Sequence, residues 1–177
     1  ASPTQTLFVC TTGKSSRELF ELRQKRGDSH RFDFLTVGGM GHASQIAVAL
    51  ANAQPEKTVV CIDGDAAFLM HMGSIAVGAS LGTGNFFHFV LNNGCHESVG
   101  GQETLAKKIS LSKITKSCGY RHSNMIQTNS ERRMLEEISD FFSKRGPAFL
   151  DIHIGKGSRT NLGRPTIKPV QNKSDFM

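Results

Sequence analysis

Two polar residues that follow apolar segments carry the clearest chemistry in this sequence. Asp65 comes soon after the apolar residues 59–62, and Asn92 stands 27 positions further on, directly after residues 86–91. Both segments are rich in β-branched and aromatic residues, which predicts two buried strands. A carboxylate and an amide oxygen are hard ligands that suit Mg²⁺ or Ca²⁺, and Mg²⁺ usually takes its remaining oxygens from phosphates and water. The pair therefore predicts a metal site that holds a phosphate-bearing ligand.

Such a site requires that the two strands run in parallel and end at the same edge. Predicted strands alternate with predicted helices along the chain, which indicates an α/β fold: a doubly wound parallel sheet flanked by helices. Ligands bind at the carboxyl ends of the strands in such sheets. The strands are expected at residues 7–10, 34–37, 59–62, 86–91 and 148–154, and the helices at 16–25, within 38–53 after a glycine turn, at 67–81, within 105–118 and at 131–144.

The last part of the chain has a different composition. Residues 155–177 are rich in Lys, Arg, Pro and Asn and show little periodicity. We therefore expect one domain over residues 1–154 and an extended tail over residues 155–177 that contributes no core element.

Composition and charge exclude several classes of protein. The 177 residues are enough for one domain with a substantial core, and no apolar run approaches the roughly 18 residues of a membrane span. The net charge of +6 is dispersed, and no nucleic-acid-binding motif accompanies it. We expect no membrane and no nucleic-acid partner, but a site for small anionic ligands. The four cysteines are widely spaced with no CxxC pair, which favours a reducing, cytoplasmic compartment.

The turn TTGKSS, residues 11–16, follows the first predicted strand and has the features of an anion site. Its hydroxyls, Lys14 and the backbone N–H groups at the start of a helix all favour a negatively charged group. Ser15 or Ser16 is expected to cap that helix. The GxxxxGK[ST] spacing of a nucleotide-binding P-loop is missing. An ordinary capped turn would contain the same residues, so Lys14 taken singly fits either interpretation.

The Gly-Asp pair at residues 64–65 and the Asn-Asn pair at residues 92–93 resemble the signature of the thiamine diphosphate-dependent enzyme family. The diphosphate-binding domain of that family carries GDG and, at a similar distance, NN. The resemblance implies thiamine diphosphate and Mg²⁺ as cofactors, with the metal held by the side chains of Asp65 and Asn92 and by the carbonyl of Gly94. Ala66 stands where the family usually has glycine, but it keeps its backbone N–H, so cofactor binding is expected to survive.

The same resemblance assigns further cofactor contacts. Gly38 accepts a hydrogen bond from the cofactor amino group, and Met40 is the apolar wedge that supports the bent cofactor. Taken alone, Met40 could equally be a core residue. The cofactor-binding residues that the resemblance implies are Thr12, Gly13, Lys14, Ser15, Gly38, Gly39, Met40, Gly64, Asp65, Ala66, Ala67, Asn92 and Gly94.

The loop CHESVGGQ, residues 95–102, directly follows the expected metal ligands and should overhang the reacting atoms. His96 and Glu97 are the candidate catalytic residues, because they could bind substrate or move protons. A solvated loop is the alternative for both. For Cys95 we favour the role of a small buried residue over that of a nucleophile. For His71 we favour a packing or supporting role over that of a catalytic base.

Within the thiamine diphosphate family, the loop and the tail motif KGSRTNLGRPT resemble the carboxyl-terminal half of the phosphonopyruvate decarboxylases. This implies decarboxylation of a small anionic 2-oxo acid, 3-phosphonopyruvate. The sulfopyruvate decarboxylases, which divide their two domains between subunits, are the alternative. A subunit of an acetolactate-type enzyme and a noncatalytic diphosphate-binding module also stay open.

The resemblance also implies that this chain holds half of an active site. The glutamate that activates thiamine diphosphate belongs to the pyrimidine-binding domain of the family, and no residue here matches it. We therefore expect a partner domain or subunit of that kind, within a homo- or hetero-oligomer. The chain is then either a segment of a longer protein or one of two subunits.

Overall fold

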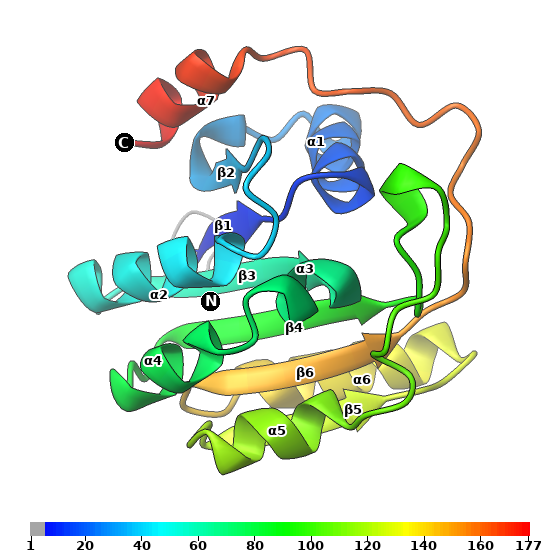
Figure 1. The fold of residues 1–177 in the computed structure, drawn as a ribbon. Helices are drawn as coiled ribbons and strands as arrows, with labels where there is room; N and C mark the ends of the chain where they lie inside the picture. Colours follow the sequence, from blue (N-terminus) through cyan, green and yellow to red (C-terminus); the bar gives the residue numbers. More distant parts are fainter. Residues whose placement is uncertain (1–5) are drawn as a thin grey trace.

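Six parallel strands form the centre of the protein, and the computed structural model describes residues 6–177 (Figure 1). The strands lie side by side in the order β2-β1-β3-β4-β6-β5, and every neighbouring pair is parallel. Their bounds are β1 Thr6–Cys10, β2 Asp33–Leu35, β3 Thr58–Gly64, β4 Phe86–Asn92, β5 His122–Ile126 and β6 Ala148–His153. The predicted doubly wound parallel sheet is therefore confirmed.

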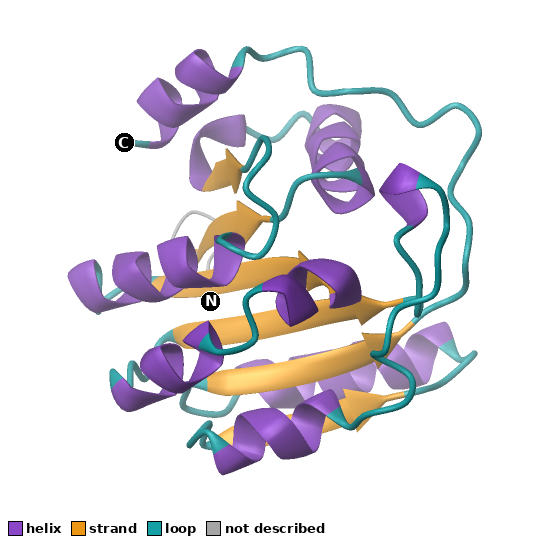
Figure 2. Cartoon of the chain, viewed as in Figure 1, coloured by secondary structure: helices purple, strands orange, loops and turns teal. Residues whose placement is uncertain are grey.

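Among residues 6–177, α-helices cover the sheet on both faces, and the last helix lies at the β2 edge (Figure 2). Side chains alternate between the faces along each strand. Leu7 and Val9 of β1 thus join the core under one set of helices, whereas Cys10 joins the core under α1. The helices are α1 Lys14–Arg26, α2 Ala43–Ala53, α3 Asp65–Met70, α4 Ser74–Ser80, α5 Leu111–Ser117, α6 Glu131–Phe142 and α7 Pro169–Phe176.

The register of the sheet brings the two predicted strand ends together. β3 pairs directly with β4, and Gly64 lies opposite Leu91. Asp65 is the first residue of α3, and Asn92 is the last residue of β4. The two residues therefore lie at the same carboxyl edge, as the sequence predicted.

Three elements differ from the prediction. The helix expected over residues 67–81 is two helices, because the chain turns at His71–Gly73 between α3 and α4. Strand β5 was not predicted, since its sequence HSNMI is mostly polar and lies at the edge of the sheet. Helix α1 begins at Lys14 after Gly13, and no side chain caps it, so the predicted capping by Ser15 or Ser16 is wrong.

The tail is extended only in its first part, so the expectation that residues 155–177 contribute no core element is wrong at the end of the chain. Arg159 binds Glu18 and Glu21 on α1, and the Gly163 N–H also donates to Glu21. Residues 169–176 then form α7, whose Asn172 is 4% exposed and bonds both Asp33 O and Leu35 N of β2. The tail is therefore held at both ends. The division of the chain at residue 154 stays a prediction.

A buried ion pair joins α1 to β2. The guanidinium of Arg23 binds both carboxylate oxygens of Asp33 at 2.8 and 2.9 Å, and the Asp33 side chain is fully buried. Burial raises the pKa of the Asp33 carboxyl, and the hydrogen bonds from Arg23 oppose that rise. The ion pair thereby fixes α1 to β2.

Candidate functional site

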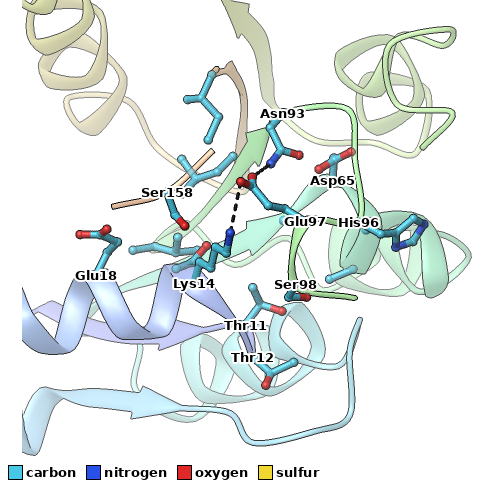
Figure 3. A pocket seen from close by; sticks show the side chains of 18 of the residues that line it. Thr11, Thr12, Lys14, Glu18, Asp65, Asn93, His96, Glu97, Ser98 and Ser158 are labelled. Atoms are coloured by element: carbon cyan, nitrogen blue, oxygen red, sulfur yellow. Dashed lines mark hydrogen bonds and ion pairs between the residues drawn. The ribbon is translucent and has the colours of Figure 1, made fainter. Parts of the chain in front are cut away.

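A cavity of about 520 Å³ opens at the carboxyl edge of β1, β3 and β4 (Figure 3). Its walls come from the turn after β1, the start of α3, the loop after β4 and the beginning of the tail. Three of the predicted cofactor-binding regions, residues 12–15, Met40 and residues 64–67, therefore contribute to one space, whereas Asn92 and Gly94 are not among its lining residues within 6–177. The predicted residues that line it are Thr12, Gly13, Lys14, Ser15, Met40, Gly64, Asp65, Ala66, Ala67, His96 and Glu97.

Asp65 and Asn92 supply buried oxygen atoms of the kind that a cation site requires. Asp65 is 2% exposed, and its Oδ2 accepts a hydrogen bond from Thr104 Oγ1 at 2.5 Å. Asn92 is fully buried and donates from Nδ2 to Asp151 Oδ1 at 3.1 Å. The Oδ1 of Asn92 has no hydrogen-bond partner within residues 6–177. A buried acceptor without a partner is costly unless an ion or water satisfies it, so this donor set fits Mg²⁺.

Gly94, the third predicted metal ligand, is positioned by the same threonine. Its φ of +72° lies in the left-handed region that favours glycine, and its carbonyl accepts the Thr104 N–H at 3.0 Å. A carbonyl oxygen has a second lone pair that could bind a metal. Thr104 thus bonds both Asp65 and Gly94, and it holds the loop after β4 against the start of α3.

Asp151 is the residue that determines how the Asn92 amide faces. It lies on β6, where it is 3% exposed, and its Oδ2 is 3.3 Å from His153 Nε2. Burial raises the pKa of the Asp151 carboxyl, and the hydrogen bond from Asn92 opposes the rise. Because Asp151 accepts a hydrogen from Asn92 Nδ2, the side-chain Oδ1 of Asn92 must face the other way.

Lys14 and Glu97 meet across the cavity (Figure 3). The Lys14 Nζ lies 3.2 Å from Glu97 Oε1, and Asn93 Nδ2 donates to Glu97 Oε2 at 2.5 Å. The predicted anion ligand Lys14 and the predicted catalytic residue Glu97 are therefore partners. An anion that enters the cavity would compete with Glu97 for the ammonium group.

The glycine turn after β2 brings one of its predicted residues to the cavity. Met40 is half-buried and lines the wall, whereas Gly38 and Gly39 are exposed and are not among the lining residues within 6–177. Gly41 explains the close fit of this turn: a Cβ there would lie 2.8 Å from the Ala67 carbonyl. The turn therefore packs directly on α3.

Two histidines in this region lie in different environments. His71 is exposed and packs edge-on against His42, with ring centroids 4.1 Å apart. His96 lines the cavity, and its backbone N–H and carbonyl bond Gln102, Val99 and Gly101 within the loop. The packed role expected for His71 agrees with this contact, and His96 remains the candidate for chemistry.

Sequence reasoning gave no individual role to four residues that shape the site: Thr11, Asn93, Thr104 and Asp151. Thr11 has a buried hydroxyl without a hydrogen-bond partner among the described residues. Asp151 could have been noticed, because a carboxylate inside the apolar segment AFLDIHI near its carboxyl end is unusual for a structural strand. Nothing in the sequence distinguishes Thr104 from other loop residues.

No helix among residues 6–177 has the length and apolar composition needed to cross a membrane.

Comparison with known proteins identifies a matching family and individual relatives within it. A family model described as "Thiamine pyrophosphate enzyme, C-terminal TPP binding domain" matches residues 11–152. A phosphonopyruvate decarboxylase of Streptomyces viridochromogenes is 37% identical over 173 residues, which are 96% of this chain and 41% of that protein. The sulfopyruvate decarboxylase subunit beta of Methanothermobacter thermautotrophicus is 33% identical over 152 residues, which are 86% of this chain and 75% of that subunit.

The chain thus spans about two fifths of the length of the phosphonopyruvate decarboxylases that it matches. Among solved structures, the 2-oxoglutarate:ferredoxin oxidoreductase of Magnetococcus marinus superposes with a TM-score of 0.70 at 16% sequence identity. The superposition covers 88% of this chain and 56% of the oxidoreductase chain. A thiamin diphosphate-dependent enzyme of Mycobacterium smegmatis gives 0.68 at 21% identity, with 88% and 29% covered. At these identities the superpositions establish the fold alone.

Proposed function

This chain belongs to the thiamine pyrophosphate enzyme family, whose C-terminal cofactor-binding domain it forms, and we propose that it provides the diphosphate- and Mg²⁺-binding half of a 2-oxo acid decarboxylase. The proposed reaction converts 3-phosphonopyruvate to phosphonoacetaldehyde and CO₂. The observation that carries the proposal is the buried Asn92 Oδ1, which lacks a partner among residues 6–177 and belongs to the same edge of the sheet as Asp65. The similarity to phosphonopyruvate decarboxylases over nearly the whole chain supports the choice of substrate.

In this proposal Asp65, Asn92 and Gly94 hold Mg²⁺, and the metal in turn holds the cofactor diphosphate. When thiamine diphosphate is bound, it supplies the electron sink that decarboxylation of a 2-oxo acid requires. The turn Thr12–Ser15 places backbone and hydroxyl donors at the same cavity, where they favour an anion. Met40 supports the cofactor from the side of the glycine turn.

His96 and Glu97 are the residues that we assign to the substrate side of the cavity. Glu97 is held by two contacts, from Lys14 and from Asn93, so its carboxylate has a fixed position at the wall. A carboxylate fixed in this way can orient a substrate or move a proton at the reacting end. Both residues lie on the loop after β4, next to the residues assigned to the metal.

The proposal requires a second domain, because the family resemblance places the activating glutamate elsewhere. Large apolar side chains are exposed on α2, on α4 and on the turn before α4, including Ile46 at 38%, Met72 at 37% and Val77 at 56%. Helices α2 and α4 lie side by side on the same face of the sheet (Figure 1). An apolar surface of this kind suits a pyrimidine-binding domain or subunit, in a homo- or hetero-oligomer.

Reconstitution tests this function. The chain alone should not decarboxylate phosphonopyruvate, and the chain combined with a pyrimidine-binding domain should do so in the presence of Mg²⁺ and thiamine diphosphate. Steady-state rates with phosphonopyruvate, sulfopyruvate and pyruvate then rank the substrates. Turnover by the chain alone, at a rate typical of enzymes (roughly 1–10³ s⁻¹), would contradict the half-site proposal.

A sulfopyruvate decarboxylase is the second candidate function, because the subunit relatives match most of their own length as well as most of this chain. The same rate comparison decides between the two. A noncatalytic module would instead bind thiamine diphosphate no better than ATP in calorimetry with and without Mg²⁺.

A further inference from the structure

A second cavity, of about 420 Å³, adjoins the first one on the side of β2. It lies between the turn after β1, the end of β2 and the tail. Thr12, Gly13, Met40 and Ser98 line both cavities, so the two spaces share a wall. A ligand in the second cavity would thus lie next to the proposed cofactor site without contacting the proposed metal ligands.

The tail forms the roof of this cavity, and contacts on both sides fix its position. On one side, Arg159 and Gly163 bond the carboxylates of Glu18 and Glu21 on α1. On the other side, Asn172 bonds the backbone of β2. The segment between them, residues 164–169, supplies the roof residues Arg164, Pro165 and Ile167. Its two prolines restrict the backbone, so the roof has a defined position in the fold.

Arg17 and Arg164 give the cavity its charge. They are the only charged residues among those that line it within the described chain. No carboxylate in residues 6–177 forms an ion pair with either of them, whereas Arg23 and Arg159 are each paired with two carboxylates. Thr12 and Ser98, which carry hydroxyl groups, lie on the same walls, whereas the Thr36 hydroxyl already donates to the Cys10 carbonyl. Two free guanidinium groups beside hydroxyl donors suit an oxyanion with more than one negative charge.

We propose that this second cavity binds the phosphonate group of a 2-oxo acid substrate, with Arg17 and Arg164 as its ligands. The inference rests on the proposed decarboxylase function and extends it by naming the substrate-binding residues. A phosphonate, like a phosphate monoester, has a second acidic proton and can carry two negative charges, whereas a sulfonate carries a single charge. Two arginines match the phosphonate better, so the cavity favours phosphonopyruvate over sulfopyruvate.

Methylphosphonate is the probe for binding, because it carries the phosphonate group and nothing that can react. Its affinity for the protein saturated with thiamine diphosphate and Mg²⁺, measured by calorimetry, should fall about tenfold or more in Arg17→Gln and in Arg164→Gln. Methanesulfonate should bind more weakly than methylphosphonate. Arg132→Gln is the matched control, since Arg132 is exposed on α6 and pairs with Glu136. It should leave both affinities unchanged.

Two binding results would overturn the inference. One is an unchanged methylphosphonate affinity in both cavity variants. The other is an equal loss of affinity for thiamine diphosphate, because the arginines would then belong to the cofactor site. Inorganic phosphate distinguishes a third case: if it binds as tightly as methylphosphonate and does not compete with phosphonopyruvate, the cavity is a regulatory phosphate site and the inference fails.

Kinetics of the enzyme assembled with its pyrimidine-binding domain give the second readout. Arg17→Gln and Arg164→Gln should raise the KM for phosphonopyruvate about tenfold and lower kcat much less, because they remove binding of a remote group. If no 2-oxo acid is decarboxylated but methylphosphonate binding still depends on both arginines, the proposed function fails and the anion site stands.

Discussion

Asn92 on β4 donates its amide hydrogen to Asp151 on the neighbouring strand β6, with 3.1 Å between Nδ2 and Oδ1. The bond fixes the orientation of the Asn92 side-chain amide, whose Oδ1 has no hydrogen-bond partner among residues 6–177. Partners that orient a metal ligand are often nearly as important as the ligand itself. Asp151 is thus a positioning residue for the proposed metal site.

The first prediction concerns Asp151. Asp151→Ala should weaken Mg²⁺ binding by about 10–100-fold, because the Asn92 amide is no longer oriented. Asp151→Asn should have a smaller effect, since its carbonyl oxygen can still accept the Asn92 hydrogen. Titration of thiamine diphosphate binding with Mg²⁺ measures both, and thermal melts monitor folding. Wild-type affinity in the alanine variant would remove Asp151 from the site.

Asp65→Ala should abolish Mg²⁺-dependent binding of thiamine diphosphate, because the only carboxylate among the three proposed ligands is lost. The matched control is Asp175→Ala on α7, where the carboxylate is exposed and bonds only Gln171 within the described residues. Calorimetry with and without Mg²⁺ measures the effect. If the Asp65 variant binds the cofactor as the wild type does, the metal assignment is wrong.

Met40→Ala distinguishes the two roles considered for Met40, support of the bent cofactor and packing in the core. Full removal of a buried methionine side chain costs about 2–5 kcal/mol in a core, but Met40 is only half-buried and lines a cavity. We therefore expect a smaller loss of unfolding free energy together with a clear loss of kcat in the reconstituted enzyme. Denaturant unfolding and steady-state kinetics test the two parts. A variant that melts early but keeps full activity when folded would show that Met40 acts only in packing.

Arg23→Met should destabilise the fold by about 3–5 kcal/mol at pH 7, because it leaves the Asp33 carboxylate buried without its partner. The pKa of Asp33 is already raised by burial, and without Arg23 it should rise further. A raised carboxyl pKa in the folded state means that stability is lost as pH rises through it, so the deficit should shrink as pH falls. Urea unfolding at several pH values measures this. An exposed control, Arg26→Met, should change stability little.

The alternation of strands and helices, and the shared edge of Asp65 and Asn92, could be predicted because apolar segments and strand ends are local features of the sequence. Strand β5 could not, because His122–Ile126 is mostly polar and is recognised as a strand only through its pairing with β6. Helix α7 could not, because PVQNKSDF has no apolar periodicity and is fixed by Asn172 and by Phe176, which packs on Phe34.

The same limit applies to the site. Asp65, Asn92 and the turn after β1 carry signals in their residue types and positions. Thr104 and Asp151 act through contacts across 39 and 59 residues of sequence, and such contacts become visible only in three dimensions. The second cavity likewise depends on a tail that returns to β2, which no local pattern indicates.

The bonds from Asn172 to β2 also have a consequence for solubility. β2 is one of the two edge strands of the sheet, and the exposed backbone of an edge strand can pair with another molecule. One side-chain amide here accepts the N–H of Leu35 and donates to the carbonyl of Asp33, so it makes the two bonds that a neighbouring strand would make. A chain that ends before residue 169 would present this edge uncovered, and we expect it to aggregate edge to edge even though its six strands are intact.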